Sequence, residues 1–212
     1  MHPAAAVAFC GTPAARCCNP AATPVYWNPS QDVKSHPLDK ESPLPPVVST
    51  ATLPRATNRV AILVNPRAGA RDSLPRAQRL AELLQQQDFK VEIFTDLQAV
   101  ASAANEMLTE GSLRTLVAVG GDGTAAELVN RTLPGVPLTL FPAGNSNLAA
   151  RYFALSNDPD VACRTILEGT AAKVDAGLAN SRIFLLMVGC GFDADVVHRV
   201  HGRRKGHMNH LA

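Results

Sequence analysis

From Arg59 onward, strand-like and helix-like segments alternate along the chain, and this alternation limits the possible folds more than any other feature. Short apolar or alternating runs are typical of strands, and apolar residues three and four apart are typical of helices. The predicted strands are 60–65, 90–95, 113–119, 136–141, 173–178 and 182–190. The predicted helices are 74–87, 98–109, 124–133, 146–153 and 160–168. Such an order favours an α/β fold with a mostly parallel sheet, whose ligands bind beyond the carboxyl ends of the strands.

The composition excludes several classes of protein. The 212 residues are 46% hydrophobic and 18% charged, which is enough apolar material for a packed core. A net charge of +2 gives no sign of a nucleic-acid partner. No apolar run reaches the roughly 18 residues of a spanning helix, so we expect no transmembrane segment. The five cysteines form no CxxC pair and the N-terminus lacks a signal-peptide pattern, which favours a reducing, cytoplasmic setting.

Residues 1–58 differ in character from the rest of the chain. They contain 10 of the 16 prolines and one of the 14 glycines, and they show no periodic apolar pattern. Proline also biases the residue before it away from helix. We therefore predict a Pro-rich, disordered tail over 1–58.

The loop Gly120-Gly121-Asp122-Gly123-Thr124 lies between a predicted strand and a predicted helix. Glycines let a ligand approach the backbone, and a helix N-terminus attracts anions, so this loop predicts a phosphate site. A carboxylate repels neighbouring phosphates unless a cation or a proton transfer requires it. Asp122 should therefore either hold Mg²⁺ or accept a proton from an attacking hydroxyl. The alternative is a tight turn with an Asp cap. Likewise Glu127, three residues after Thr124, could simply complete a capping box.

Two further loops follow predicted strands. Asn65-Pro66-Arg67-Ala68-Gly69 follows the first, and Pro142-Ala143-Gly144-Asn145-Ser146-Asn147 follows the fourth. Asn145 and Asn147 are suited either to direct a second helix N-terminus at the same phosphates or to serve as ordinary N-caps. Asn65 could begin an Asx turn. Spacing alone leaves these alternatives open.

Taken together and in order, these loops resemble the diacylglycerol kinase catalytic-domain family, which includes bacterial diacylglycerol kinases and the sphingosine kinases. The matching segments are Asn65-Pro66-x-x-Gly69, Thr95, Gly120–Thr124 with Glu127 and Asn130, Pro142-x-Gly144-x-x-Asn147 with Ala150-Arg151, Val174-Asp175-x-Gly177, and Gly189–Asp193. The similarity extends from residue 59 to about residue 212. Asn145 stands where the family usually has Thr.

The resemblance implies a doubly wound nucleotide-binding domain like that of phosphofructokinase over 59–170, followed by part of a β-rich domain over 171–212. It implies transfer of the γ-phosphate of ATP, with Mg²⁺, to the hydroxyl of diacylglycerol or a related lipid at a membrane surface. Asp122 would be the catalytic and Mg²⁺-binding residue. The implied nucleotide-binding residues are Asn65, Pro66, Gly69, Thr95, Gly120, Gly121, Gly123, Thr124, Glu127, Gly144, Asn145 and Asn147.

Only about 40 residues are left for the second domain, whereas a closed β-sandwich takes roughly 100. We therefore expect an incomplete copy with weak or no activity alone. The alternatives are an NAD kinase-like enzyme, which shares the GGDGT turn, and a non-catalytic nucleotide-binding fragment.

Residues 198–212 contain four histidines and four basic residues but no acid. This pattern is consistent with attraction to anionic lipid headgroups. It is also consistent with a metal site built from His198/His201 and His207/His210, or with a solvated basic helix end. The sequence does not separate these three alternatives.

Overall fold

The fold is known from a computed structural model, which describes residues 6–9, 49–54, 56–65, 73–168, 170–174 and 176–202. The strands are β1 (Ala6–Phe9), β2 (Ser49–Thr52), β3 (Arg59–Val64), β4 (Lys90–Phe94), β5 (Leu113–Gly120), β6 (Pro137–Pro142), β7 (Thr170–Val174), β8 (Gly177–Ala179) and β9 (Arg182–Phe184). The helices are α1 (Ser73–Gln85), α2 (Leu97–Thr109), α3 (Asp122–Val129), α4 (Leu148–Tyr152), α5 (Pro159–Glu168) and α6 (Phe192–Gly202). The predictions for Pro66 and Gly69 lie outside the described residues, as do those for His207 and His210.

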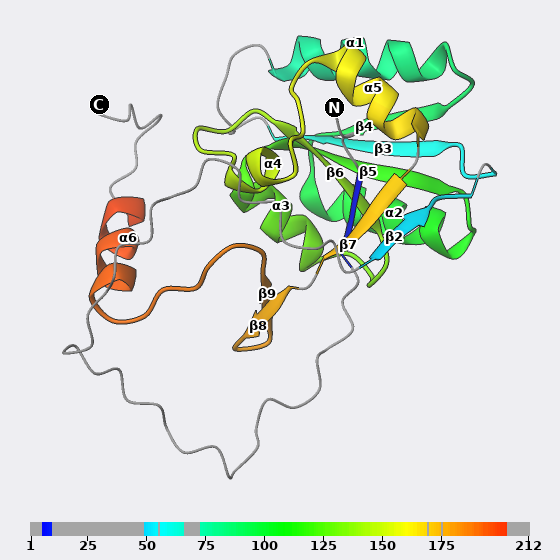
Figure 1. The fold of residues 1–212 in the computed structure, drawn as a ribbon. Helices are drawn as coiled ribbons and strands as arrows, with labels where there is room; N and C mark the ends of the chain where they lie inside the picture. Colours follow the sequence, from blue (N-terminus) through cyan, green and yellow to red (C-terminus); the bar gives the residue numbers. More distant parts are fainter. Residues whose placement is uncertain are drawn as a thin grey trace, which may run out of the picture.

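Seven of the strands form one sheet in the order β2-β7-β1-β6-β5-β3-β4 (Figure 1). Within it, β6, β5, β3 and β4 are consecutive and parallel, with Ile62 paired to both Ile93 and Val117. Three of these strands, β3, β5 and β6, are buried along their whole length or at all but one residue, and β5 is buried completely. This matches the continuous apolar runs expected where helices cover both faces of a parallel sheet. The prediction of a doubly wound, mostly parallel α/β fold is confirmed.

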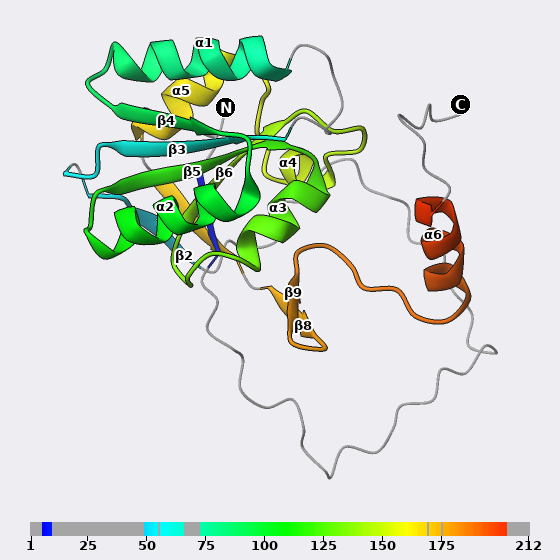
Figure 2. The ribbon, with the colours of Figure 1, turned by 180° about the vertical axis from the view of Figure 1, so that it is seen from behind.

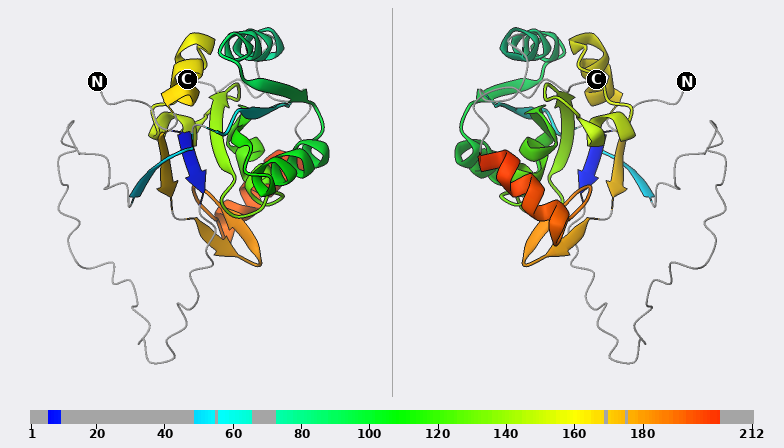
Figure 3. Two further views of the ribbon diagram at one scale, coloured as in Figure 1. Left: turned by 90° about the vertical axis from the view of Figure 1, so that its right-hand side faces the viewer. Right: turned by 90° about the vertical axis from the view of Figure 1, so that its left-hand side faces the viewer.

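The helices form two layers, one on each face of the sheet (Figures 2 and 3). Helices α1 and α5 pack beside each other on one face, over alternate residues of β3 and β5 that include Val60, Ile62 and Val119. Helices α2, α3 and α4 pack on the other face, over Ala61, Leu63 and the remaining alternate residues. Successive side chains of a strand point to opposite faces, so each central strand contributes to two separate cores.

Three features differ from the sequence-based expectations. Strands β1 and β2 come from the segment expected to be a disordered tail, and the expected domain boundary at residue 171 falls inside β7, which pairs with both of them. The predicted strands 173–178 and 182–190 are replaced by β7 and the short hairpin β8–β9. Helix α6 was not predicted. Its apolar residues Phe192, Val196 and Val200 recur every four residues, and its first turn contains two acidic residues. Pairing with partners 100 or more residues away leaves no local pattern, which explains the missed strands.

None of the helices in the described part of the chain combines the length and apolar character needed to cross a bilayer.

Candidate active site at the carboxyl edge of the sheet

The carboxyl ends of β3 and β5 form the point where the chain reverses its direction of winding. The helix after β3 lies on one face of the sheet and the helix after β5 lies on the other, and such a reversal point is where ligands of open α/β sheets usually bind. Asn65 directly follows β3 and is tied to the loop after β5, since its side-chain Nδ2 donates to Thr124 Oγ1 at 2.9 Å. Its backbone N–H donates to the Val119 carbonyl at 3.2 Å. The sequence therefore placed this pair of loops correctly at one edge.

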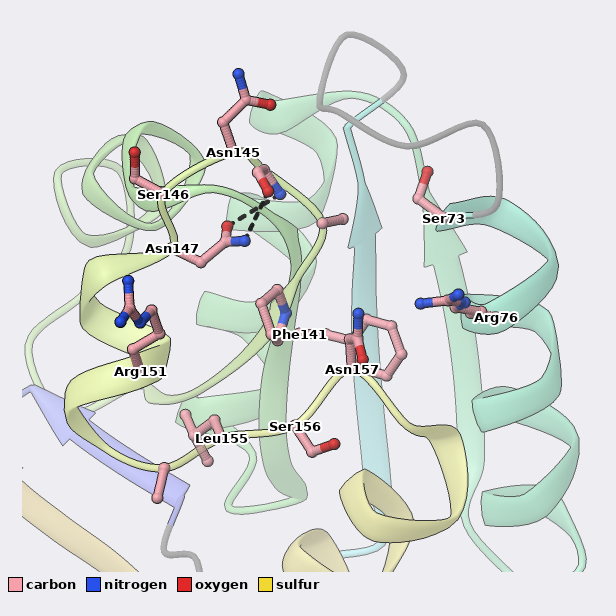
Figure 4. A pocket seen from close by; sticks show the side chains of 14 residues that line it. Ser73, Arg76, Phe141, Asn145, Ser146, Asn147, Arg151, Leu155, Ser156 and Asn157 are labelled. Carbon is pink, nitrogen blue, oxygen red and sulfur yellow. Dashed lines mark hydrogen bonds between the residues drawn. The ribbon is translucent and has the colours of Figure 1, made fainter. Parts of the chain in front are cut away.

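The loop after β6 packs directly against the loop after β5. A Cβ added to Gly144 would lie 2.7 Å from the Cα of Gly121, so these two glycines allow the backbones to touch. Asn147, in the left-handed conformation with φ 47°, fixes the bend. Its Oδ1 accepts from Gly144 N–H at 2.9 Å and its Nδ2 donates to the Gly144 carbonyl at 2.6 Å (dashed lines in Figure 4).

Asp122 joins the same two loops through its carboxylate. Oδ2 accepts from the Leu148 N–H and Oδ1 from the Ala149 N–H, both at 2.9 Å. These are orphan donors in the first turn of α4, where Asn147 is the N-cap residue but provides no side-chain hydrogen bond. Asp122 thus caps α4 from a different segment of the chain. Each carboxylate oxygen keeps another lone pair, so this contact is compatible with a role toward Mg²⁺ or a proton.

Helix α3 begins two residues earlier than predicted, with Gly121 as its N-cap and no side-chain cap. The proposed capping box between Thr124 and Glu127 is therefore wrong. Thr124 lies within the first turn, where its hydroxyl accepts from Asn65, and a Cβ on Gly120 would overlap its side chain. A Cβ on Gly123 would meet nothing within 4 Å, so this position faces open space, whereas a Cβ on Gly121 would lie 3.3 Å from Gly144 Cα.

Glu127 lies on α3 five residues after Asp122 and forms two ion pairs. Its Oε1 accepts from Arg182 at 2.6 Å and its Oε2 from Arg131 at 2.9 Å. The hydrogen bond from Arg182, followed by that from Arg131, lowers the pKa of the Glu127 carboxyl from its ordinary value of 4.5 despite partial burial. Glu127 therefore faces the hairpin rather than the loops.

The lowered pKa of Glu127 gives a pH-dependent contribution to stability. We expect wild type to be more stable than Glu127→Gln at neutral pH by less than about 1 kcal/mol, because the carboxylate is about one-third exposed to water and screened. A lowered folded-state pKa means that this difference is present above pH 4.5 and shrinks as the pH falls below it. Urea unfolding of both proteins from pH 3 to pH 7 measures it. A constant difference across this range would contradict the assignment.

A groove of about 780 Å³ opens beside these loops. Its walls come from the start of α1, the end of β6 with its loop, α4, and the segment after α4 (Figure 4). Arg76 on α1 and Arg151 on α4 stand on opposite walls. The described lining residues are Ser73, Arg76, Phe141, Pro142, Ala143, Gly144, Asn145, Ser146, Asn147, Arg151, Ala154, Leu155, Ser156 and Asn157. Two arginines and no carboxylate in this set favour an anionic ligand.

The predicted site residues are brought together only in part. Gly144, Asn145 and Asn147 line the groove, whereas Asn65, Asp122 and Thr124, with the glycines 120, 121 and 123, form the neighbouring edge. Thr95 is exposed at the end of β4 and does not line the groove.

Arg76 was missed by sequence reasoning. A cation in the first turn of a helix opposes the helix dipole, and this conflict is the signal that could have identified it.

The described residues contain no group of three or more His, Cys, Asp or Glu side chains that could hold a metal ion together. A metal at this edge would therefore take one carboxylate, that of Asp122, with the remaining ligands from water and a bound phosphate. Mg²⁺ is commonly bound in this way, through one or two carboxylates and substrate phosphates. The residues present fit that mode.

Comparison with known proteins gives consistent matches. The family model described as the diacylglycerol kinase catalytic domain matches residues 59–179. The diacylglycerol kinase of Bacillus subtilis (strain 168) is 29% identical over 162 residues, which are 73% of this chain and 52% of that protein. The diacylglycerol kinase of Staphylococcus aureus (strain JH9) is 39% identical over 79 residues, 36% of this chain and 25% of that protein.

A solved structure has a similar fold. The crystal structure of a diacylglycerol kinase from Bacillus anthracis str. Sterne superposes with a TM-score of 0.50 at 24% sequence identity, covering 60% of this chain and 48% of that one. This chain thus spans about half the length, or less, of the relatives it matches.

Proposed function

The chain belongs to the diacylglycerol kinase catalytic-domain family, and from that premise we propose that it takes part in the ATP-dependent phosphorylation of a lipid hydroxyl. The acceptor would be diacylglycerol or a related lipid, reached by the cytoplasmic protein at a membrane surface. Homologues named diacylglycerol kinase support a kinase of this class. The NAD kinase alternative shares the GGDGT turn, but the family match over 59–179 favours the lipid kinases.

One observation carries this proposal: three loops after parallel strands meet at the reversal point of the sheet, beside a groove with two arginines and no carboxylate among its described lining residues. Phosphates bind well where glycine backbone and a helix N-terminus face an open space. The start of α3 has this arrangement, since Gly121 and Gly123 carry no side chains. The nucleotide would therefore place its phosphates at α3 and extend along the groove.

Phosphoryl transfer of this kind depends on position and charge rather than on covalent chemistry by the protein. The acceptor oxygen forms a bond to the γ-phosphorus while the bond to the bridging oxygen of ADP breaks, and the hydroxyl proton leaves to a base. In this proposal Asp122 would accept that proton or hold Mg²⁺, which when bound would neutralise phosphate charge. Its two backbone partners hold the carboxylate in one orientation.

The two arginines of the groove allow a test of nucleotide binding that does not require turnover. We expect Arg76→Ala and Arg151→Ala each to weaken ATP binding about tenfold, the loss of roughly one charge-assisted contact. Arg79→Ala is the matched control, because Arg79 lies on α1 in an exposed ion pair with Glu82 and does not line the groove. Titration calorimetry measures all three affinities. Equal affinities for Arg151→Ala and Arg79→Ala would place the nucleotide elsewhere.

The activity itself is tested with the full chain, labelled ATP, Mg²⁺ and a panel of lipids in mixed micelles. Label transferred to a lipid supports the proposal, and label transferred to NAD instead would favour the alternative enzyme. ATP binding without transfer to any acceptor would support a nucleotide-binding protein that does not act alone. Absence of ATP binding would overturn the proposal.

A further inference from the structure

The hairpin β8–β9 needs support from the rest of the molecule. It has two strands of three residues each, joined by Asn180 and Ser181, which both adopt positive φ, as a two-residue type I′ turn requires. An isolated two-stranded hairpin is at best marginally stable in water. Figures 1 and 2 show it beside the end of α3 and apart from the large sheet. The contacts that hold the hairpin in this position also determine where the following segment, residues 185–202, begins.

Asn130, the C-cap residue of α3, holds the hairpin at Ile183. Its Oδ1 accepts from the Ile183 N–H at 2.8 Å, and its Nδ2 donates to the Ile183 carbonyl at 2.8 Å. One side-chain amide thus pairs with both backbone groups of a single residue, as a neighbouring strand would. The Nδ2 also donates to the Ala126 carbonyl at 2.8 Å, which fixes the direction of the amide.

Two neighbouring contacts support the same position. Ile183 borders a small apolar cavity of about 30 Å³ together with Val129, Val136 and Leu138. Arg182 pairs with Glu127 at 2.6 Å, one turn of α3 before Asn130. That ion pair is largely exposed, so it is the weaker contact. The amide of Asn130 is therefore the contact that fixes both the position and the register of β9.

We propose that Asn130 is a positioning residue that sets the place of the hairpin relative to the phosphate loop, and that it does not bind the nucleotide. Helix α3 starts in that loop at Asp122 and carries Asn130 at its other end, about 12 Å away at 1.5 Å per residue. A rigid helix of this length keeps the hairpin at a fixed distance from the loop. Any effect on phosphoryl transfer rests on the proposed function, whereas the seating of the hairpin does not.

Hydrogen exchange of the full chain tests the seating directly. In Asn130→Ala the Ile183 amide should exchange at least about tenfold faster, while amides of β5 such as Val117 keep their wild-type rates. Asn130→Asp keeps the acceptor for Ile183 N–H but turns a carboxylate toward the Ile183 carbonyl, and should also exchange faster. Thr109→Ala is the matched control, since it removes a hydrogen bond to the carbonyl four residues earlier in the last turn of α2. Unchanged Ile183 exchange in both Asn130 variants would overturn the proposal.

ATP affinity of the same proteins separates positioning from ligand binding. Asn130→Ala should bind ATP within about twofold of wild type, whereas Arg151→Ala should not. A tenfold loss in Asn130→Ala would make Asn130 part of the nucleotide site and overturn the proposal. If wild type binds no ATP, the proposed function fails, but the exchange rates still decide whether Asn130 seats the hairpin.

Discussion

Gly144→Ala is expected to lower the free energy of unfolding by about 3 kcal/mol, near the upper end for overpacking, and to weaken ATP binding at least about 100-fold. The new Cβ would lie 2.7 Å from Gly121 Cα and 2.9 Å from Asn147 Oδ1. The first neighbour is backbone and cannot rotate away, so one of the two loops must move. Both loops belong to the proposed phosphate site, and stability and binding should therefore fall together.

Substitutions at two further glycines are expected to cause smaller losses of stability than Gly144→Ala. In Gly121→Ala the new Cβ would lie 3.3 Å from Gly144 Cα, a contact that a small shift can relieve, so the loss of stability should be smaller. Gly189→Ala is the neutral control, because its Cβ would meet only Ala194 N at 3.8 Å. Urea unfolding and ATP titration of the three variants should rank them in the order 144, 121, 189. A Gly144→Ala protein as stable as Gly189→Ala would show that the loops do not touch in solution.

The parallel part of the fold could be predicted because its information is local. The strands 60–65 and 113–119 are predominantly apolar, and each is followed by a helix with its own periodic pattern, so their order and winding follow. Strands β1 and β2 could not be predicted in the same way. They depend on pairing with β7, and the Ala- and Thr-containing sequences of β1 and β2 pair there without a distinctive pattern.

The candidate site shows the same difference between local and long-range information. Glycines, Asn65 and Asp122 could be assigned to one edge, because the carboxyl ends of parallel strands meet there. The partners of those side chains could not be predicted, since Asp122 bonds to residues 148 and 149 and Glu127 to Arg182, contacts that span 26 residues or more. The resemblance to a family marked Asn130 as a motif residue, and its side-chain amide bonds to the hairpin at Ile183. A motif therefore marks residues without revealing what each one touches.

Asp122→Asn is expected to remove any lipid kinase activity and also to lower the free energy of unfolding by about 1.5 kcal/mol. If the residue acted only on Mg²⁺ or a proton, stability would be unaffected or would rise. Instead both of its oxygens accept from backbone N–H groups of α4, at 2.9 Å each. An amide has one oxygen, so its NH₂ group would face a second N–H donor. A hydrogen bond to a charged group contributes about 1.5–3 kcal/mol, and the partial exposure of these two contacts to water places the expected loss at the lower end of that range.

Asp96→Asn is the matched control for this substitution. Asp96 caps α2 from within its own segment, where a single oxygen accepts from the Ala99 N–H at 2.7 Å. Asn is as good an N-cap as Asp in that arrangement, so we expect a change within about 0.5 kcal/mol. Thermal or urea unfolding of both variants, followed by ATP titration and the lipid assay, separates the two roles of Asp122. Lost activity with wild-type stability would assign Asp122 to chemistry alone, whereas loss of both would mean that one carboxylate orders the loop and serves the reaction.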